Sequence, residues 1–159
     1  MTDSEQTLGP MRSAFSFLER EYGFRPVHEE YLAEFFGNAV LQFATEQLMV
    51  QVICDRNQYF CRFGSPTDPQ VCFAEATILQ ALEENVDYQS LVQSKWASLY
   101  NLATIVQRHF PRIIAMFATE MYPTTRSTLI TLRRRHLEET LGYEPKDDTM
   151  FILRPKGSG

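Results

Sequence analysis

The sequence predicts an α+β fold: an N-terminal helix, a four-stranded antiparallel meander, and then three or four helices packed on one face of the sheet. The first supporting observation lies between Tyr31 and Phe63, where four short runs of β-branched and aromatic residues are separated by two to four turn residues. Runs joined in this way are typical of antiparallel hairpins. The second is that apolar residues elsewhere recur at helical spacing. We therefore expect the helices to cover the sheet.

The N-terminal helix is predicted between Met11 and Tyr22, because its apolar residues lie three or four positions apart. Gly23 is expected to end it, and Pro26 to prevent it from restarting. The strands are expected at residues 31–36, 39–45, 48–54 and 59–63. The middle two strands alternate most regularly, with one uniformly apolar face and one mixed, half-solvated face.

Helical spacing returns after the prolines of the 64–69 loop. We predict helices at 73–82 and 91–109, and either a kink or a new helix at Pro111. Tyr122 and Pro123 are expected to end that segment. The last helix is predicted to start at Thr124 or Thr125 and to stop before Gly142.

Chain length and composition indicate one folded unit with loose ends. A chain of 159 residues fits one domain, and 44% hydrophobic against 22% charged residues is ordinary for a globular protein. We predict a flexible tail over residues 1–10, a single α+β domain over 11–143, and a C-terminal tail over 144–159. The apolar run 150–153 within that tail is a candidate for a short docked strand.

Compartment and cofactors follow from what the sequence lacks. No apolar run approaches the roughly 18–20 residues that span a bilayer, and the N-terminus has no signal-peptide pattern. We expect a cytoplasmic protein without membrane contact. Cys54, Cys61 and Cys72 are odd in number and show no metal-ligand spacing, so we expect reduced thiols, no metal and no cofactor.

Residue patterns for catalysis are weak. The sequence has neither a G-x-S-x-G nucleophile motif nor a glycine-rich phosphate loop. His28, His109 and His136 are scattered, and a catalytic histidine needs a positioned partner. The carboxylates mostly adjoin another carboxylate in sequence, which places neighbours on different faces of a strand or helix. We therefore expect no catalytic residues and no enzymatic activity.

A basic stretch, Arg133-Arg134-Arg135, is the sharpest charge feature. Residues 124–159 hold seven Lys/Arg and five Asp/Glu, whereas residues 1–123 hold eight and fifteen, giving a net charge of −5 overall. One interpretation is an anion or nucleic-acid contact. The other is helix pairing, since Arg134 and Glu138 are four positions apart, as are Arg135 and Glu139. Consecutive arginines spread around a helix and suit no single groove, so nucleic acid is not an expected partner.

The mixed face of the meander is the predicted partner-binding surface. Aromatic anchors surrounded by polar groups are where protein interfaces concentrate binding energy, and acidic rims speed encounter with basic partners. The alternative is that these aromatics belong to the core and the polar groups are merely solvated. The predicted contact residues are Glu30, Tyr31, Glu34, Phe36, Gln42, Gln51, Tyr59 and Arg62.

The phrase Phe15-x-Phe17-Leu18-x-x-Glu21-Tyr22-Gly23-Phe24, followed by a meander and helices, resembles small bacterial α+β proteins of the toxin-immunity type. The resemblance spans roughly residues 1–80 and carries no catalytic residues. It implies a non-enzymatic binder of another protein. A looser similarity is to the acidic α/β chaperones of type III secretion, although their strands and helices interleave and those predicted here do not.

Together these patterns favour a non-enzymatic, cytoplasmic protein-binding module of the bacterial immunity or defence type. The partner would be another protein, such as a basic toxin or effector, bound by a monomer or homodimer. A hydrolase-like or other enzyme whose site no motif marks is the alternative. A type III secretion chaperone-like protein or a nucleic-acid-associated regulator is the third. A cleft that holds a buried carboxylate and a histidine would favour the enzyme.

Overall fold

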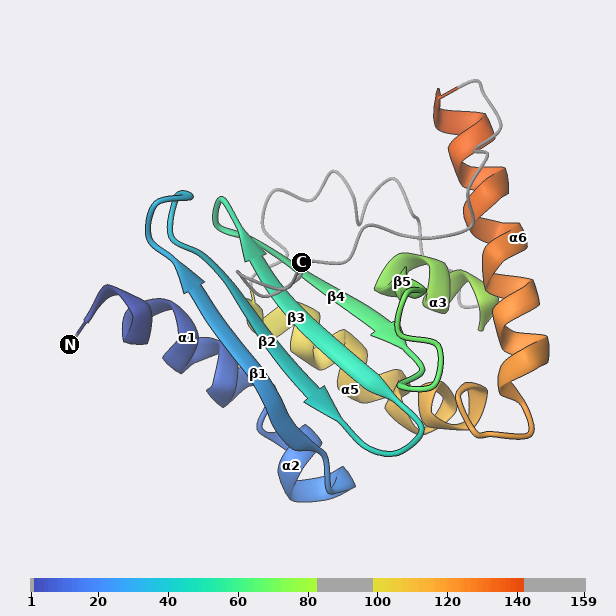
Figure 1. The fold of residues 1–159 in the computed structure, drawn as a ribbon, viewed down its shortest axis with the longest axis horizontal. Coiled ribbons are helices and arrows are strands. Elements are labelled where there is room, and N and C mark those ends of the chain that lie inside the picture. Colours follow the sequence, from blue (N-terminus) through green and yellow to red (C-terminus); the bar gives the residue numbers. More distant parts are fainter. Residues whose placement is uncertain (1, 83–98, 142–159) are drawn as a thin grey trace.

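The computed structural model describes residues 2–82 and 99–141, and shows an antiparallel sheet with helices against one of its faces (Figure 1). The strands follow the chain order without a crossover. They are β1 (Arg25–Leu32), β2 (Asn38–Ala44), β3 (Met49–Asp55), β4 (Gln58–Gly64) and β5 (Cys72–Ala74). The helices are α1 (Asp3–Ala14), α2 (Phe17–Tyr22), α3 (Glu75–Ala81), α5 (Leu99–Met116) and α6 (Tyr122–Leu141). The predicted α+β class is confirmed.

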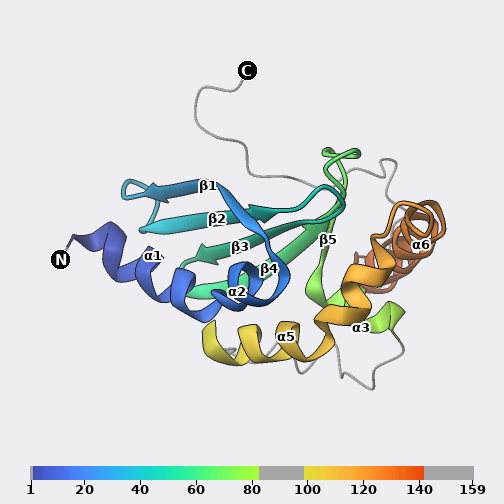
Figure 2. The same cartoon turned by 90° about the horizontal axis from the view of Figure 1, so that it is seen from below.

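One face of the sheet forms the core. Strand pairing sets Leu41 opposite Val52, and Val52 opposite Cys61, so these side chains share a face. All three are buried, and Figure 2 shows α1, α2 and α5 on that side of the sheet. We call this the inner face. Helices α3 and α6 contact each other at the β5 end instead.

The outer face is less open than its mixed composition predicts. Val40 on β2 and Gln51 and Ile53 on β3 belong to it, and each is at most 5% exposed. Phe60 on β4 lies directly opposite Ile53 and is 39% exposed. Solvent therefore reaches the margins of this face more than its centre.

Helix α1 begins at Asp3, so the predicted flexible tail over residues 1–10 is corrected. Thr2 caps the helix by accepting a hydrogen bond from the backbone N–H of Glu5 at 3.3 Å. Leu8 is 4% exposed and joins the core together with Met11. Pro10 lies within the helix. Burial of Leu8 and Met11 thus outweighs the helix-breaking signal of this proline.

The predicted helix from Met11 to Tyr22 is in fact two helices. Helix α1 ends at Ala14 and α2 begins at Phe17. Phe15 and Phe17 are both buried, with ring centroids 5.9 Å apart. Two positions apart in one helix would point them about 200° apart, so the break lets both rings enter the core. Gly23 ends α2 at φ 71°, as predicted.

The predicted strand at 31–36 is the most displaced element. Strand β1 starts earlier, at Arg25, and the chain turns from Ala33 to Gly37. Pro26 is tolerated because β1 is an edge strand. The pairing with β2 slips between Pro26 and His28, which leaves Val27 half exposed. Strands β2, β3 and β4 agree with prediction to within one residue at each end.

The remaining corrections concern the β5 region and the later prolines. Residues 72–74, assigned in part to a helix, form β5 before α3 begins. Helix α5 runs through Pro111 without ending. Pro123 lies in the first turn of α6, where its missing N–H needs no partner. The predicted helix start at Leu91 and the tail 144–159, including 150–153, lie outside the described residues.

None of the helices within the described ranges is both long enough and apolar enough to cross a bilayer.

Candidate binding surfaces

The structure divides the predicted contact residues between the two faces and the hairpin turns. Glu30, Gln42, Gln51 and Arg62 lie on the outer face, as expected. Tyr31 and Tyr59 do not. Both lie on the inner face and pack, partly buried, against the core.

Gln42 and Gln51 bond mainly to each other across the outer face. The Gln51 Nε2 amide donates to Gln42 Oε1 at 3.1 Å, and Gln42 Nε2 lies 2.8 Å from the Met49 sulfur. Gln51 is only 2% exposed, and its Oε1 accepts no hydrogen bond. A partner could not reach Gln51 directly. The predicted outer-face contact is therefore corrected at this residue.

Two exposed phenylalanines mark the turn between β1 and β2. Phe35 is 55% exposed and Phe36 is 74% exposed, the highest value among the large apolar side chains described. Phe36 adopts φ 58°, in the left-handed region that bulky residues rarely occupy. The exposed ring therefore stands on a backbone conformation that is unfavourable for a bulky residue.

The neighbouring hairpin braces this turn. The guanidinium carbon of Arg56, in the β3–β4 turn, lies 4.9 Å from the centroid of the Phe36 ring. The backbone N–H of Arg56 donates to Asn38 Oδ1 at 2.9 Å, and Asn38 Nδ2 donates to Asp55 Oδ1 at 3.0 Å. Figure 1 shows the two hairpin tips side by side. We name Phe35, Phe36 and Arg56 the hairpin-end surface.

Gly37 allows the chain to return from Phe36 into β2. Its φ is 69°, and a Cβ at this position would lie 3.0 Å from the Tyr31 hydroxyl. Any larger residue would combine strain with a close contact to that ring. Tyr31 thus supports the hairpin-end surface from the inner face.

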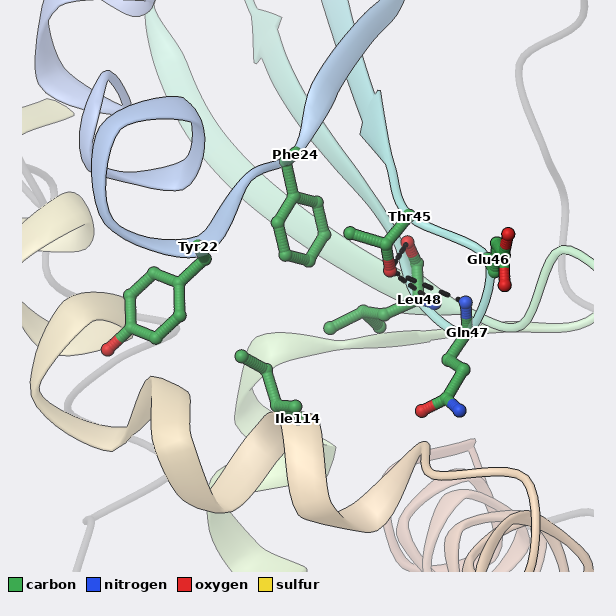
Figure 3. Close-up of a pocket in the computed structure, with 7 residues that line it drawn as sticks. All are labelled: Tyr22, Phe24, Thr45, Glu46, Gln47, Leu48 and Ile114. Atoms are coloured by element: carbon green, nitrogen blue, oxygen red, sulfur yellow. Dashed lines mark hydrogen bonds between the residues drawn. The ribbon is translucent and has the colours of Figure 1, made fainter.

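A groove of about 330 Å³ lies at the opposite end of the sheet, beside the β2–β3 turn (Figure 3). Phe24 and Leu48 are buried, whereas Tyr22 and Ile114 are partly exposed. Glu46 and Gln47 are exposed. We name this site the turn groove; it is lined by Tyr22, Phe24, Thr45, Glu46, Gln47, Leu48 and Ile114.

Side-chain bonds and ring contacts hold the turn groove in shape. Thr45 Oγ1 accepts from the backbone N–H groups of Gln47 and Leu48 at 3.4 and 3.2 Å (Figure 3). The Tyr22 ring packs edge-on against Phe110, with centroids 4.7 Å apart. Both walls are therefore fixed without a ligand.

Among the carboxylates of the described residues, Glu75 has the largest shift in pKa. Strand β5 ends at Ala74, so the Cys61 N–H on β4 donates instead to Glu75 Oε2 at 3.0 Å. Burial raises the pKa of Glu75 to about 7. Hydrogen bonds from the backbone N–H groups of Glu75 and Cys61, together with the charge of Arg62, act in the opposite direction. Glu75 is not among the residues that line the turn groove. The geometry gives it a structural role at the end of the sheet.

The three arginines of the basic stretch do not share one environment. The Arg133 guanidinium lies 5.2 Å from the Phe73 ring centroid and donates to the Cys72 carbonyl at 3.4 Å. Arg134 is partly buried and Arg135 is exposed. Arg133 thus ties α6 to β5, a contact that neither interpretation of the stretch had included.

Within residues 2–82 and 99–141, no group of three or more His, Cys, Asp or Glu side chains could hold a metal ion. Cys54, Cys61 and Cys72 are free thiols, as predicted, and all three are buried.

Sequence reasoning missed Phe35, Arg56 and the turn groove. Phe35-Phe36-Gly37-Asn38 did carry a signal, because glycine and asparagine favour a turn and leave the preceding aromatics at its tip. The turn groove had no comparable signal, since it joins residues far apart in the chain.

No protein-family model, curated protein or solved structure matches this chain.

Proposed function

We propose that this chain is a non-enzymatic binding module for another protein, and that the hairpin-end surface is its principal contact. The observation that carries the proposal is Phe36, whose side chain is 74% exposed on a backbone at φ 58°. A non-glycine residue in a sparsely populated backbone region costs about 1–3 kcal/mol and tends to occur where function requires it. Glycine or asparagine would fit this position at lower cost.

Contacts around Phe36 support a role in binding rather than in folding. Aromatic residues and arginine are enriched in protein interfaces and supply many of their binding hot spots. Here an arginine already lies over the exposed aromatic ring. Because the two hairpins are joined through Asn38, less side-chain freedom would be lost on binding. The hairpin-end surface is thus prepared for a partner.

Charge suggests the kind of partner. Glu30 and Glu34 lie close in sequence to the tip, and Asp55 lies beside Arg56. Residues 1–123 carry most of the acidic excess, so a basic partner would be attracted and wrong partners of like charge repelled. This supports the immunity-type role, with a basic toxin or effector as the partner. Reduced buried thiols agree with a cytoplasmic setting, which is part of the proposal.

The test is capture of partners from native cytoplasm by the wild-type protein, by Phe36→Ala and by a matched control, Met121→Ala. Met121 is 48% exposed and precedes α6, at the end of the molecule away from the hairpin tips (Figures 1 and 2). A hot-spot aromatic contributes about 2 kcal/mol or more, roughly thirtyfold in affinity. We expect the wild type and Met121→Ala to retain a partner that folded Phe36→Ala loses. Equal capture by all three would overturn the proposal.

A further inference from the structure

We propose that the turn groove is a second protein contact, which accepts an apolar side chain of a partner with a lysine or arginine next to it. The turn groove lies beside the β2–β3 turn, whereas the hairpin-end surface lies at the β1–β2 and β3–β4 turns. In a meander these turns are at opposite ends of the sheet (Figure 1). The inference is therefore independent of the proposed function.

The floor of the turn groove selects an apolar group. The Phe24 and Leu48 side chains, 4% and 1% exposed, form its base, and Ile114 of α5 closes one side. The polar atoms of Thr45 are already used within the turn. A volume of about 330 Å³ exceeds that of any one aliphatic side chain and falls at the lower end of ligand pockets.

The rim adds a negative charge. Glu46 is exposed at the edge of the turn groove, and none of the ion pairs found among the described residues involves it. Arg25 is paired with Ala44, which is two positions before Glu46 in the sequence. Arg25 forms no ion pair with Glu46. A cationic neighbour of the bound apolar side chain would meet this carboxylate. The charge of Glu46 should therefore favour binding of a segment flanked by lysine or arginine over binding of an acidic segment.

Rigidity makes the site usable as it stands. The Thr45 bonds fix the turn, and Tyr22 is held by its edge-on contact with Phe110. Little reorganisation is needed before binding, so the cost of ordering falls mainly on the partner segment. This combination of apolar floor, single acid and fixed walls is what the proposal rests on.

The experiment titrates the full chain with short capped peptides, monitored by backbone amide and methyl NMR shifts. The probes are acetyl-Lys-Leu-Lys-amide, acetyl-Glu-Leu-Glu-amide and acetyl-Lys-Ala-Lys-amide. We expect Lys-Leu-Lys to shift the signals of Gln47, Leu48 and Ile114 saturably, with a dissociation constant of about 10–100 mM, the range for one buried side chain. Replacing leucine with alanine should weaken binding about tenfold or more. Reversing the peptide charge should weaken it about threefold or more.

Two variants separate the turn groove from the rest of the surface. Ile114→Trp should fill it and abolish the shifts, and Glu46→Lys should remove the preference for the basic peptide. Phe36→Ala is the control and should bind all three peptides as the wild type does, so that failure here and failure of the hairpin-end surface remain distinguishable. Equal shifts with all three peptides, or none at Gln47 and Leu48, would overturn the inference. Shifts at these residues that depend on protein concentration alone would instead assign the turn groove to a second copy of the chain.

Discussion

Phe36 combines a strained backbone with an apolar ring in water. Its conformation at φ 58° opposes stability in the isolated domain, and its ring, 74% exposed, contributes almost no burial to compensate. The Arg56 guanidinium recovers part of this, about 0.5–1 kcal/mol for an exposed cation–π contact. The remainder is a cost that binding would offset. Stability and binding should therefore change in opposite directions at this residue.

Phe36→Gly should raise the free energy of unfolding by about 0.5–1 kcal/mol, because glycine adopts positive φ without steric cost. The measurement is urea unfolding followed by circular dichroism. Phe35→Gly is the matched control: Phe35 is also exposed but does not have positive φ. That variant should gain nothing or lose stability. A similar loss in both variants would mean that strain at Phe36 is absent.

Glu75 gives stability a distinctive pH dependence. Its pKa rises from 4.5 to about 7 on folding, so the native state binds more protons than the unfolded state between these values. The contribution of Glu75 is therefore neutral below about pH 4.5, becomes progressively destabilising as pH rises from 4.5 to 7, and is constant above that. Glu75→Gln keeps an acceptor for the Cys61 N–H but cannot ionise.

We expect Glu75→Gln to be more stable than wild type by about 1–3 kcal/mol at pH 8, and close to wild type near pH 4.5. Urea titrations of both proteins at these two pH values measure the difference, in which other titrating groups cancel. Glu120→Gln, at an exposed position, should change stability by less than about 0.5 kcal/mol at either pH. A pH-independent gain in Glu75→Gln would show that Glu75 does not titrate in this range.

At the scale of the element, regular alternation was the reliable signal. The central strands β2, β3 and β4 were predicted to within one residue at each end, because β-branched and aromatic residues recur between short turns. Strand β1 was missed over Arg25–Glu30, since Pro26 and a run of charged residues are typical of loops. As an edge strand with a bulge, β1 accepts both features. The position of β1 at the sheet edge, and not its local sequence pattern, therefore determines that these residues form a strand.

Helix α1 is a second case in which local sequence signals failed to predict a regular element. Gly9 and Pro10 indicated a loose tail, yet burial of Leu8 draws residues 3–10 into the helix.

Leu8→Ala should lower the free energy of unfolding by about 2–4 kcal/mol. Gln6→Ala, two positions before Leu8 on the exposed side of the helix, should remain within about 0.5 kcal/mol. If both variants unfold at the same urea concentration as the wild type, α1 is not docked in solution.

For the molecule as a whole, the sequence predicted how the layers pack but not where their surfaces meet solvent. Composition and element order suffice for a sheet covered on one face by helices. Which aromatics remain outside depends on register and on individual turns. Tyr31 and Phe36 lie five positions apart, yet one packs against the core and the other is the most exposed large apolar side chain described. The turn groove depends on three segments that meet only after folding.

The three thiols offer a measure of whole-molecule stability. Cys54, Cys61 and Cys72 are free, and each is at most 3% exposed. Burial raises the pKa of each thiol above its ordinary value, and the reactive species is the thiolate. At pH 8 the native protein should therefore react with iodoacetamide only through opening of the fold. A reducing agent should leave the melting temperature unchanged.

Labelling rates should then follow global stability across the variants. Leu8→Ala should accelerate modification of all three thiols by about tenfold or more, because each 1.4 kcal/mol changes the open population tenfold. Phe36→Gly should slow it. Mass spectrometry of the individual cysteines adds the spatial test: Cys72 lies on the short edge strand β5, whereas Cys54 and Cys61 lie on β3 and β4. Early labelling of Cys72 alone, unchanged by Leu8→Ala, would show that the β5 end opens by itself, and the fold would then not behave as one cooperative unit.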